Sequence, residues 1–343
     1  MSTGDGQSPT FDPERLKKIV TDSTRSVRPP PGFDPLKAPQ EELKTLGFPK
    51  RPDPALQPAE YAFWQEMFAP PVQFEAFDFE VLPPVPTLRR RFFVPLPRRQ
   101  SSSNWSGVYI TPRDGTVFSS IWGKFQVPTP NPPAGGRATE KYHSSTWIGL
   151  DGQRRYYRST LPQIGTAQNI DPGSGAPKKS FSAWWQWWVR DVPAQAYPTT
   201  LASPEIHAGD LIMCFMQVAD DRTGVSFVIT NLTTSRSVQF FQTAPLTDAG
   251  HPFKVPGATA EWVMERPADA PDPTPLQLPD YGTVDFHDCG AMAINMDTGQ
   301  MVERNLSAAT PMDMYVVRQK PERTVKISIA KPLDSTEFLT YFR

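Results

Sequence analysis

"NWSGVYITPRDGTVFSSIWGKFQV" (residues 104–127) is the stretch that decides the fold class. Two runs rich in Val, Ile, Phe and Trp flank the turn sequence Pro-Arg-Asp-Gly at 112–115. Runs of this kind, bounded by Gly, Pro and Asp, are typical of short strands. The stretch therefore predicts two strands of an antiparallel β fold.

The same texture continues to the C-terminus. Similar runs recur at intervals of roughly 8–20 residues, as in antiparallel sandwiches and barrels, and helical periodicity is nearly absent. Among them are "SSTWIGLDG" (144–152), "SAWWQWWV" (182–189), "DLIMCFMQV" (210–218), "SFVITNLTT" (226–234), "EWVME" (261–265) and "VKISIA" (325–330). We expect residues 101–343 to form one all-β, antiparallel domain.

Residues 1–100 have a different composition. Of the 40 prolines in the chain, 18 lie in this segment, which predicts extended, polyproline-like backbone with little regular structure. Short helices are expected at 39–47 and 58–69, where Pro58 suits a helix N-terminus. The segment ends in "LRRRFFVPLPRRQ" (88–100), with five arginines and no acid. This run is either a solvated linker, or a cleavable junction or clamp on an acidic cleft.

Composition excludes several functions. The net charge is −1, which gives no argument for nucleic-acid or membrane partners, and no apolar run approaches a membrane span. The first 18 residues hold no apolar core of a secretory signal, so a cytoplasmic location is expected from the sequence. Two distant cysteines, Cys214 and Cys289, exclude a disulfide framework.

Common catalytic motifs are missing. The chain has no HExxH, paired CxxC, GxSxG or P-loop, and its four histidines are scattered, so neither a metal site nor a Ser-His-Asp triad is expected. Asp297-Thr298-Gly299 resembles an aspartic-protease motif. That chemistry needs two such aspartates, and the single copy between two strand-like runs favours a hairpin turn.

Five segments carry the functional argument. They are "SSNWSGVYI" (102–110), "STWIGLDG" (145–152), "TLPQIGT" (160–166), "SAWWQWWV" (182–189) and "AEWVME" (260–265), with "TNLTT" (230–234) before the last. In this order and spacing, the chain resembles the glutamic peptidases, or eqolisins, over about residues 101–343. The resemblance implies a lectin-like antiparallel β-sandwich of jelly-roll architecture, an acid-acting endopeptidase without cofactor or metal, and polypeptide substrates. It also implies that residues 1–100 are a basic propeptide, and it favours secretion despite the missing signal; we expect a monomer.

The resemblance assigns the site residue by residue. The family's catalytic Gln falls on Gln163 and its catalytic Glu on Glu265. Substrate-binding residues are expected at Trp105, Trp147, Asp151, Trp184 and Gln186. Peptide hydrolysis needs a base for water and a donor for the developing oxyanion, and a carboxylate with an amide supplies both.

Strand alternation is consistent with this assignment. Glu261, Val263 and Glu265 share one face of their strand, whereas Trp262 and Met264 lie on the other, so Glu265 is expected to face a groove and Glu261 to be a groove-rim or structural acid. Trp184 and Gln186 likewise share a face, whereas Trp185 and Trp187 are expected in the core.

Some residues depart from the family pattern. Family members commonly carry carboxylates where this chain has Ala167, Ser182 and Gln186, which predicts a higher pH optimum or weaker activity. Two other hypotheses stay open: a lectin-like module that binds carbohydrate or peptide through exposed tryptophans, and a catalytically inactive pseudo-peptidase.

Overall fold

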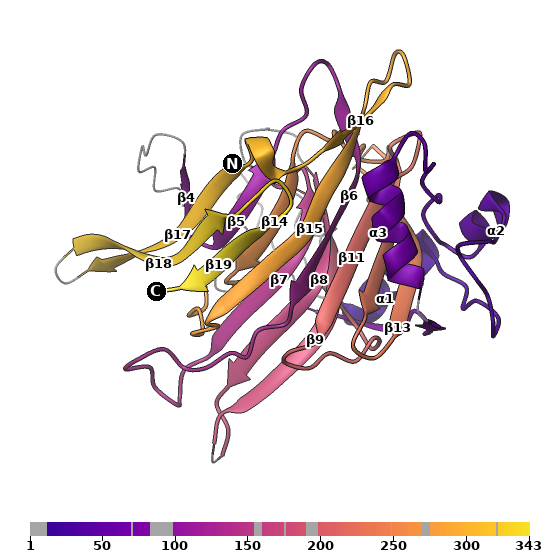
Figure 1. Ribbon diagram of the computed structural model, residues 1–343. Coiled ribbons are helices and arrows are strands. Elements are labelled where there is room, and N and C mark those ends of the chain that lie inside the picture. Colours follow the sequence, from indigo (N-terminus) through magenta and orange to yellow (C-terminus); the bar gives the residue numbers. More distant parts are fainter. Residues whose placement is uncertain are drawn as a thin grey trace, which may run out of the picture.

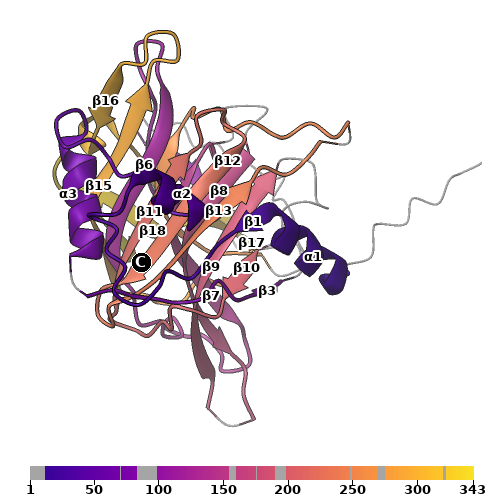
Figure 2. The same cartoon turned by 90° about the vertical axis from the view of Figure 1, so that its right-hand side faces the viewer.

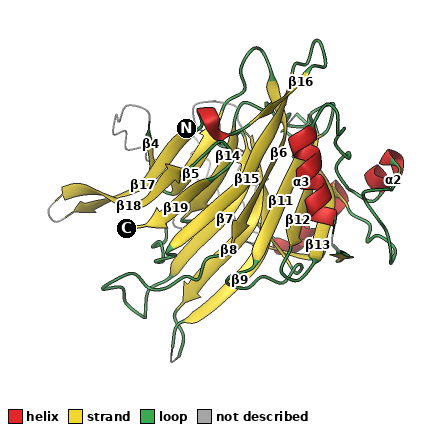
Figure 3. Cartoon of the chain, in the orientation of Figure 1, coloured by secondary structure: helices red, strands yellow, loops and turns green. Residues whose placement is uncertain are grey.

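The computed structural model describes residues 12–69, 71–82, 99–153, 160–174, 176–189, 198–247, 249–268, 275–319 and 322–343. Strands dominate from residue 100 onward, and three helices lie before residue 70 (Figure 3). Almost all strand pairs are antiparallel, so the predicted all-β antiparallel fold class is confirmed. The strands form two layers, described below as sheet 1 and sheet 2.

Sheet 1 carries the predicted site. Its order is β3–β10–β9–β8–β7–β14–β5–β17, and β4 runs parallel to β17 at its edge. The strands are β3 (Phe79–Val81), β4 (Gln100–Ser102), β5 (Trp105–Ile110), β7 (Tyr142–Leu150), β8 (Thr160–Asp171), β9 (Lys178–Val189), β10 (Thr199–Leu201), β14 (Ala260–Glu265) and β17 (Thr310–Gln319).

Sheet 2 lies behind it in the order β13–β12–β11–β6–β15. Its strands are β6 (Val117–Gln126), β11 (Leu211–Val218), β12 (Gly224–Asn231), β13 (Arg236–Thr243) and β15 (Thr283–Ile294). At one side, β18 (Glu322–Pro332) and β19 (Phe338–Phe342) connect β17 to β15 by hydrogen bonds, so the two sheets are continuous there. A short 3-10 helix, Leu306–Ala308, precedes β17.

The main core lies between the two sheets, as strand alternation predicts. Trp185 of β9 packs against Phe227 and Phe240 of sheet 2, with ring centroids 5.7 and 5.3 Å apart. Trp187 and Trp262 belong to the same buried cluster. The prediction that Trp185 and Trp187 are core residues is therefore confirmed, as is the assignment of Trp262 to the core face of its strand.

The N-terminal segment has more regular structure than its composition suggested. It contains α1 (Pro13–Ser23), α2 (Gln40–Thr45), α3 (Pro58–Phe68), β1 (Thr24–Arg25) and β2 (Gln73–Phe74), besides β3. The two predicted helices are confirmed as α2 and α3. In Figures 1 and 2, α3 lies across the face of sheet 2 that points away from sheet 1. Most of the arginine run lies in residues 83–98, outside the described residues.

The predicted hairpin turn is confirmed. The Asp297-Thr298-Gly299 motif lies in the turn between β15 and β16 (Met301–Arg304), which pair as a hairpin. The backbone N–H of Asn295 donates to Gln300 O across this turn, and Gly299 has a φ of 71°, a conformation that glycine adopts without strain. Cys214 and Cys289 are both buried free thiols. None of the helices in the described ranges is long and apolar enough to cross a membrane.

Candidate active site

Glu265 ends β14, a central strand of sheet 1 between β5 and β7. Its Oε1 accepts a hydrogen bond of 2.9 Å from Asn104 Nδ2, and its Oε2 accepts one of 2.8 Å from Trp147 Nε1. The side chain is only partly exposed. These two donors fix the direction of the half-buried carboxylate.

Gln163 lies on β8, with Gly149 of β7 on one side and Gln186 of β9 on the other. Its Nε2 donates a hydrogen bond of 2.9 Å to Gln186 Oε1. Its Oε1 is buried and has no hydrogen-bond partner within the described part of the chain. The amide is therefore held from one side only, and its second N–H is not used in that bond.

The two residues lie on the same face of sheet 1. Glu265 is paired with Ser145 of β7, and Gln163 with Gly149, four residues further along that strand. An even separation along β7 keeps both side chains on one face. Trp147 occupies the position midway between Ser145 and Gly149 and contacts Glu265 directly. The arrangement puts a carboxylate and an amide around one buried indole.

Comparison with known proteins bears on this arrangement. A model of the Peptidase A4 family matches residues 103–332. The chain belongs to the Peptidase A4 family. This membership confirms the resemblance to the glutamic peptidases, and the chain is a hydrolase of peptide bonds of that type.

The proteins that this A4 peptidase resembles differ in how similar they are to it in sequence and structure. Aspergillopepsin-2 of Aspergillus niger is 26% identical over 231 residues, which cover 62% of this chain and 70% of that protein. Two solved structures of tailspike protein 2 of bacteriophage CBA120 are 9% and 10% identical, each with a TM-score of 0.23. They match 52% of this chain, which spans only 23% and 21% of their own lengths. That likeness is too low to support an argument.

Aromatic residues surround Glu265 on the outer face of sheet 1 of the A4 peptidase. Trp105 and Trp147 meet edge to face, with ring centroids 5.0 Å apart and an interplanar angle of 79°. Trp147, Trp184 and Val263 share one apolar cluster that is separate from the main core. The Nε1 atoms of Trp105 and Trp184 are buried without a partner in the described residues.

Asp151 occupies a different environment from the one expected. It is fully buried, and its carboxylate accepts hydrogen bonds from the backbone N–H groups of Gly257, Ala258 and Thr259. Burial raises the pKa of Asp151 from 3.8 to about 6, against the effect of these donors. The side chain ties the end of β7 to the segment before β14. Contact with substrate would require these bonds to break, so Asp151 acts in this geometry on the position of β14.

Glu261 is not a groove-rim residue. Its side chain is fully buried, and its Oε1 accepts hydrogen bonds from Gln153 N, at 3.1 Å, and from Thr259 Oγ1. Burial raises the pKa of Glu261 well above 4.5, and the charge of Asp151 adds to the rise. Of the two alternatives left by the sequence, the structural acid is the one found.

The residues paired with Glu265 across the neighbouring strands of sheet 1 form a row of small, uncharged side chains. From Ser145 the register runs to Ala167 of β8 and then to Ser182 of β9. The carboxylates common in the family at the last two positions are absent from this chain, so Glu265 has no acidic neighbour along its row.

Asn104 was not identified from the sequence as a site residue. The available signal was its place in "SSNWSGVYI", directly before Trp105. The N–H of Arg266 donates to Asn104 O at 2.9 Å, which fixes the Asn104 backbone beside the end of β14. No group of three or more metal-binding side chains occurs among the described residues.

Proposed function

We propose that this chain is an endopeptidase that hydrolyses polypeptides at acidic pH with Gln163 and Glu265 as its catalytic pair. The observation that carries the proposal is their common placement on the outer face of sheet 1, each oriented by a neighbouring side chain. Family membership supports the reaction class.

The chemistry needs no further group. Ionised Glu265 takes a proton from a water molecule as the water oxygen bonds to the scissile carbonyl carbon. The free N–H of the Gln163 amide donates to the carbonyl oxygen, which becomes an oxyanion in the tetrahedral intermediate. When the C–N bond breaks, Glu265 returns its proton to the leaving amine.

Neighbouring residues position the pair. Trp147 and Asn104 hold the two carboxylate oxygens, so the base keeps one orientation through the cycle. Gln186 accepts one Gln163 N–H and directs the other away from itself. Trp105 and Trp184 supply apolar surface and unpaired donors for an extended substrate. Asp151 does not bind substrate but fixes the segment before β14 through its hydrogen bonds to the backbone.

The remaining assignments follow from the same proposal. The partner is a polypeptide, the active form is a monomer, and neither nucleic acid nor a membrane takes part. The reaction is tested by hydrolysis of a denatured protein at pH 3–5 in the presence of pepstatin and a chelator. Activity that survives both inhibitors supports the proposal, whereas loss of activity with either inhibitor contradicts it.

A further inference from the structure

Sheet 2 is apolar on both of its faces. Its inward residues, such as Phe125 and Phe227, belong to the core between the sheets. Its outward residues form a second buried cluster, contributed by Trp122, Met213, Phe215, Val228 and Met292. A sheet with two apolar faces needs a cover on each side, and among the described residues from 101 onward only sheet 1 covers a face of sheet 2.

The N-terminal segment supplies the second cover. Phe63, Trp64 and Met67 of α3 are at most 3% exposed and pack on this outer face. The rings of Phe63 and Trp64 lie 6.5 and 6.0 Å from that of Phe215. Figure 2 shows α2 and α3 on the same side of the sandwich. The contact is therefore a packed aromatic core and not a loose association.

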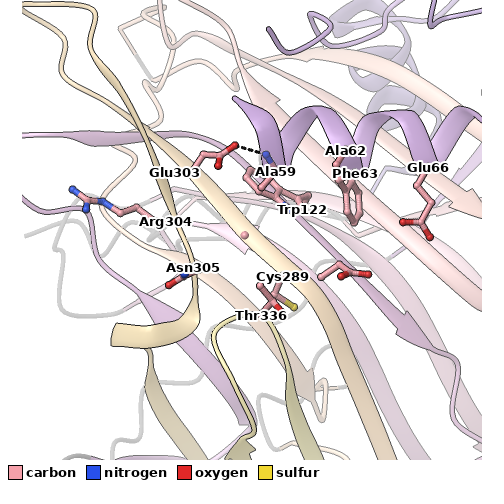
Figure 4. Close-up of a pocket in the computed structure, with 12 residues that line it drawn as sticks. Ala59, Ala62, Phe63, Glu66, Trp122, Cys289, Glu303, Arg304, Asn305 and Thr336 are labelled. Carbon is pink, nitrogen blue, oxygen red and sulfur yellow. Dashed lines mark hydrogen bonds between the residues drawn. The ribbon is translucent and has the colours of Figure 1, made fainter. Parts of the chain in front are cut away.

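Polar contacts fix the position of α3. Glu303 of β16 accepts a hydrogen bond of 2.8 Å from the first-turn N–H group of Ala59 (Figure 4). It also accepts one of 3.2 Å from the N–H of Glu60. An acid at this position satisfies helix N-terminal donors and complements the helix dipole. Ser120 Oγ donates to the buried Glu60 carboxyl at 2.6 Å, and Lys124 bridges to Glu66 at 2.6 Å. Three residues of the sandwich thus contact one helix of the segment.

Short strands extend the attachment to both sheets. β1 and β2 pair with β13, the edge strand of sheet 2, whereas β3 pairs with β10 at the edge of sheet 1. These pairings protect edges that would otherwise be exposed to other chains. The described part of the segment covers the outer face of sheet 2, on the opposite side of the sandwich from Glu265.

We propose that residues 12–82 are a permanent part of the folded peptidase, and that they stay bound to the outer face of sheet 2 when their covalent link to the sandwich is cut. The segment then differs from the removable propeptide that the family resemblance implied. Its role is to complete the core of sheet 2 and to protect both sheet edges. The proposal does not depend on the roles of Gln163 and Glu265.

The test uses the full chain with a site for a specific protease inserted after Pro86. After complete cleavage at pH 5, the mixture is run on a gel-filtration column. The proposal predicts that the N-terminal fragment co-elutes with the sandwich, and that the near-UV circular dichroism is unchanged. Separate elution of the fragment from a sandwich that keeps its cooperative unfolding would overturn the proposal.

Variants locate the contact. Trp64→Ala removes a fully buried ring, so we expect the fragment to dissociate at least about 100-fold more readily after cleavage. Leu56→Ala, at a residue of the same segment that is 66% exposed, is the matched control and should change dissociation less than about twofold. Where Trp64→Ala fails to fold, Ser120→Ala is the milder substitute. If the fragment is retained equally with Leu56→Ala and with Trp64→Ala or Ser120→Ala, the segment is not held by the outer face of sheet 2, and the proposal is wrong.

Discussion

Trp147 Nε1 donates a hydrogen bond of 2.8 Å to Oε2 of Glu265. This contact links the middle of β7 to the last residue of β14, which are neighbouring strands of sheet 1. It joins a residue expected to bind substrate to one expected to perform the chemistry. The indole therefore has a second role, which is to orient the carboxylate.

Trp147→Phe tests that role, because it keeps the aromatic ring and removes the donor. A hydrogen bond to a charged group contributes about 1.5–3 kcal/mol, so we expect kcat to fall roughly 10- to 150-fold. Trp187→Phe is the control, because the Trp187 indole lies in the core between the sheets and its N–H has no partner among the described residues. Equal losses of kcat in both variants would show that the Trp147 bond has no special effect.

Substitutions also distinguish the role of Gln163 from that of Gln186. Gln163→Ala removes the oxyanion donor, and such a loss costs about 10²–10³ in kcat. Gln186→Ala should cost less, because it removes the acceptor that positions the Gln163 amide and leaves the amide itself in place. Gln186→Glu keeps an acceptor for Gln163 Nε2 and should restore most of the activity. Failure of this rescue would contradict the positioning role of Gln186.

Glu60 gives a prediction about pH and stability. Its carboxyl is fully buried in α3, and burial raises its pKa from 4.5 to about 7; Ser120 and Gln57 oppose the rise by hydrogen bonding, and the Glu303 charge adds to it. Because the folded-state pKa lies above the unfolded one, the protonated form stabilises the fold. That contribution is complete below pH 4.5 and is lost as the pH rises to about 7.

The loss amounts to about 3 kcal/mol at 1.36 kcal/mol per pKa unit. We expect the midpoint of urea unfolding to fall between pH 4.5 and pH 7, and Glu60→Gln to reduce this dependence. Asp151, whose pKa is raised to about 6, and Glu261, whose pKa is raised well above 4.5, should leave a residual slope. An unchanged pH dependence in Glu60→Gln would show that Glu60 does not titrate with folding.

The sequence predicted the parts of the site that depend on strand alternation. The pattern of "AEWVME" put Glu265 and Val263 on the face opposite Trp262, and the structure agrees. Similarly, "SAWWQWWV" separated Trp185 from Trp184. The alternation of side chains between the two faces of a strand is a local property, so the sequence of the strand alone predicts it.

Other features depend on strand register and tertiary packing, which cannot be predicted from the local pattern of residues. The bond between Trp147 and Glu265 requires β7 to pair with β14 in one particular register. The burial of Glu261 follows from the backbone of Gln153 folding onto it. Pro58 indicated the start of a helix but not the surface that the helix covers. Proline content predicted a leader with little regular structure and short helices, but it did not predict that Phe63, Trp64 and Met67 of α3 are buried against sheet 2.

The central claim is that Glu265 is the general base of peptide hydrolysis. The most direct measurement is kcat for a denatured protein substrate at pH 3–5 with Glu265→Gln, in a preparation whose near-UV circular dichroism matches the unmodified chain. An amide keeps the shape of the side chain but cannot accept the proton from water, so we predict a loss of at least about 10³-fold. Full activity in Glu265→Gln would contradict the account.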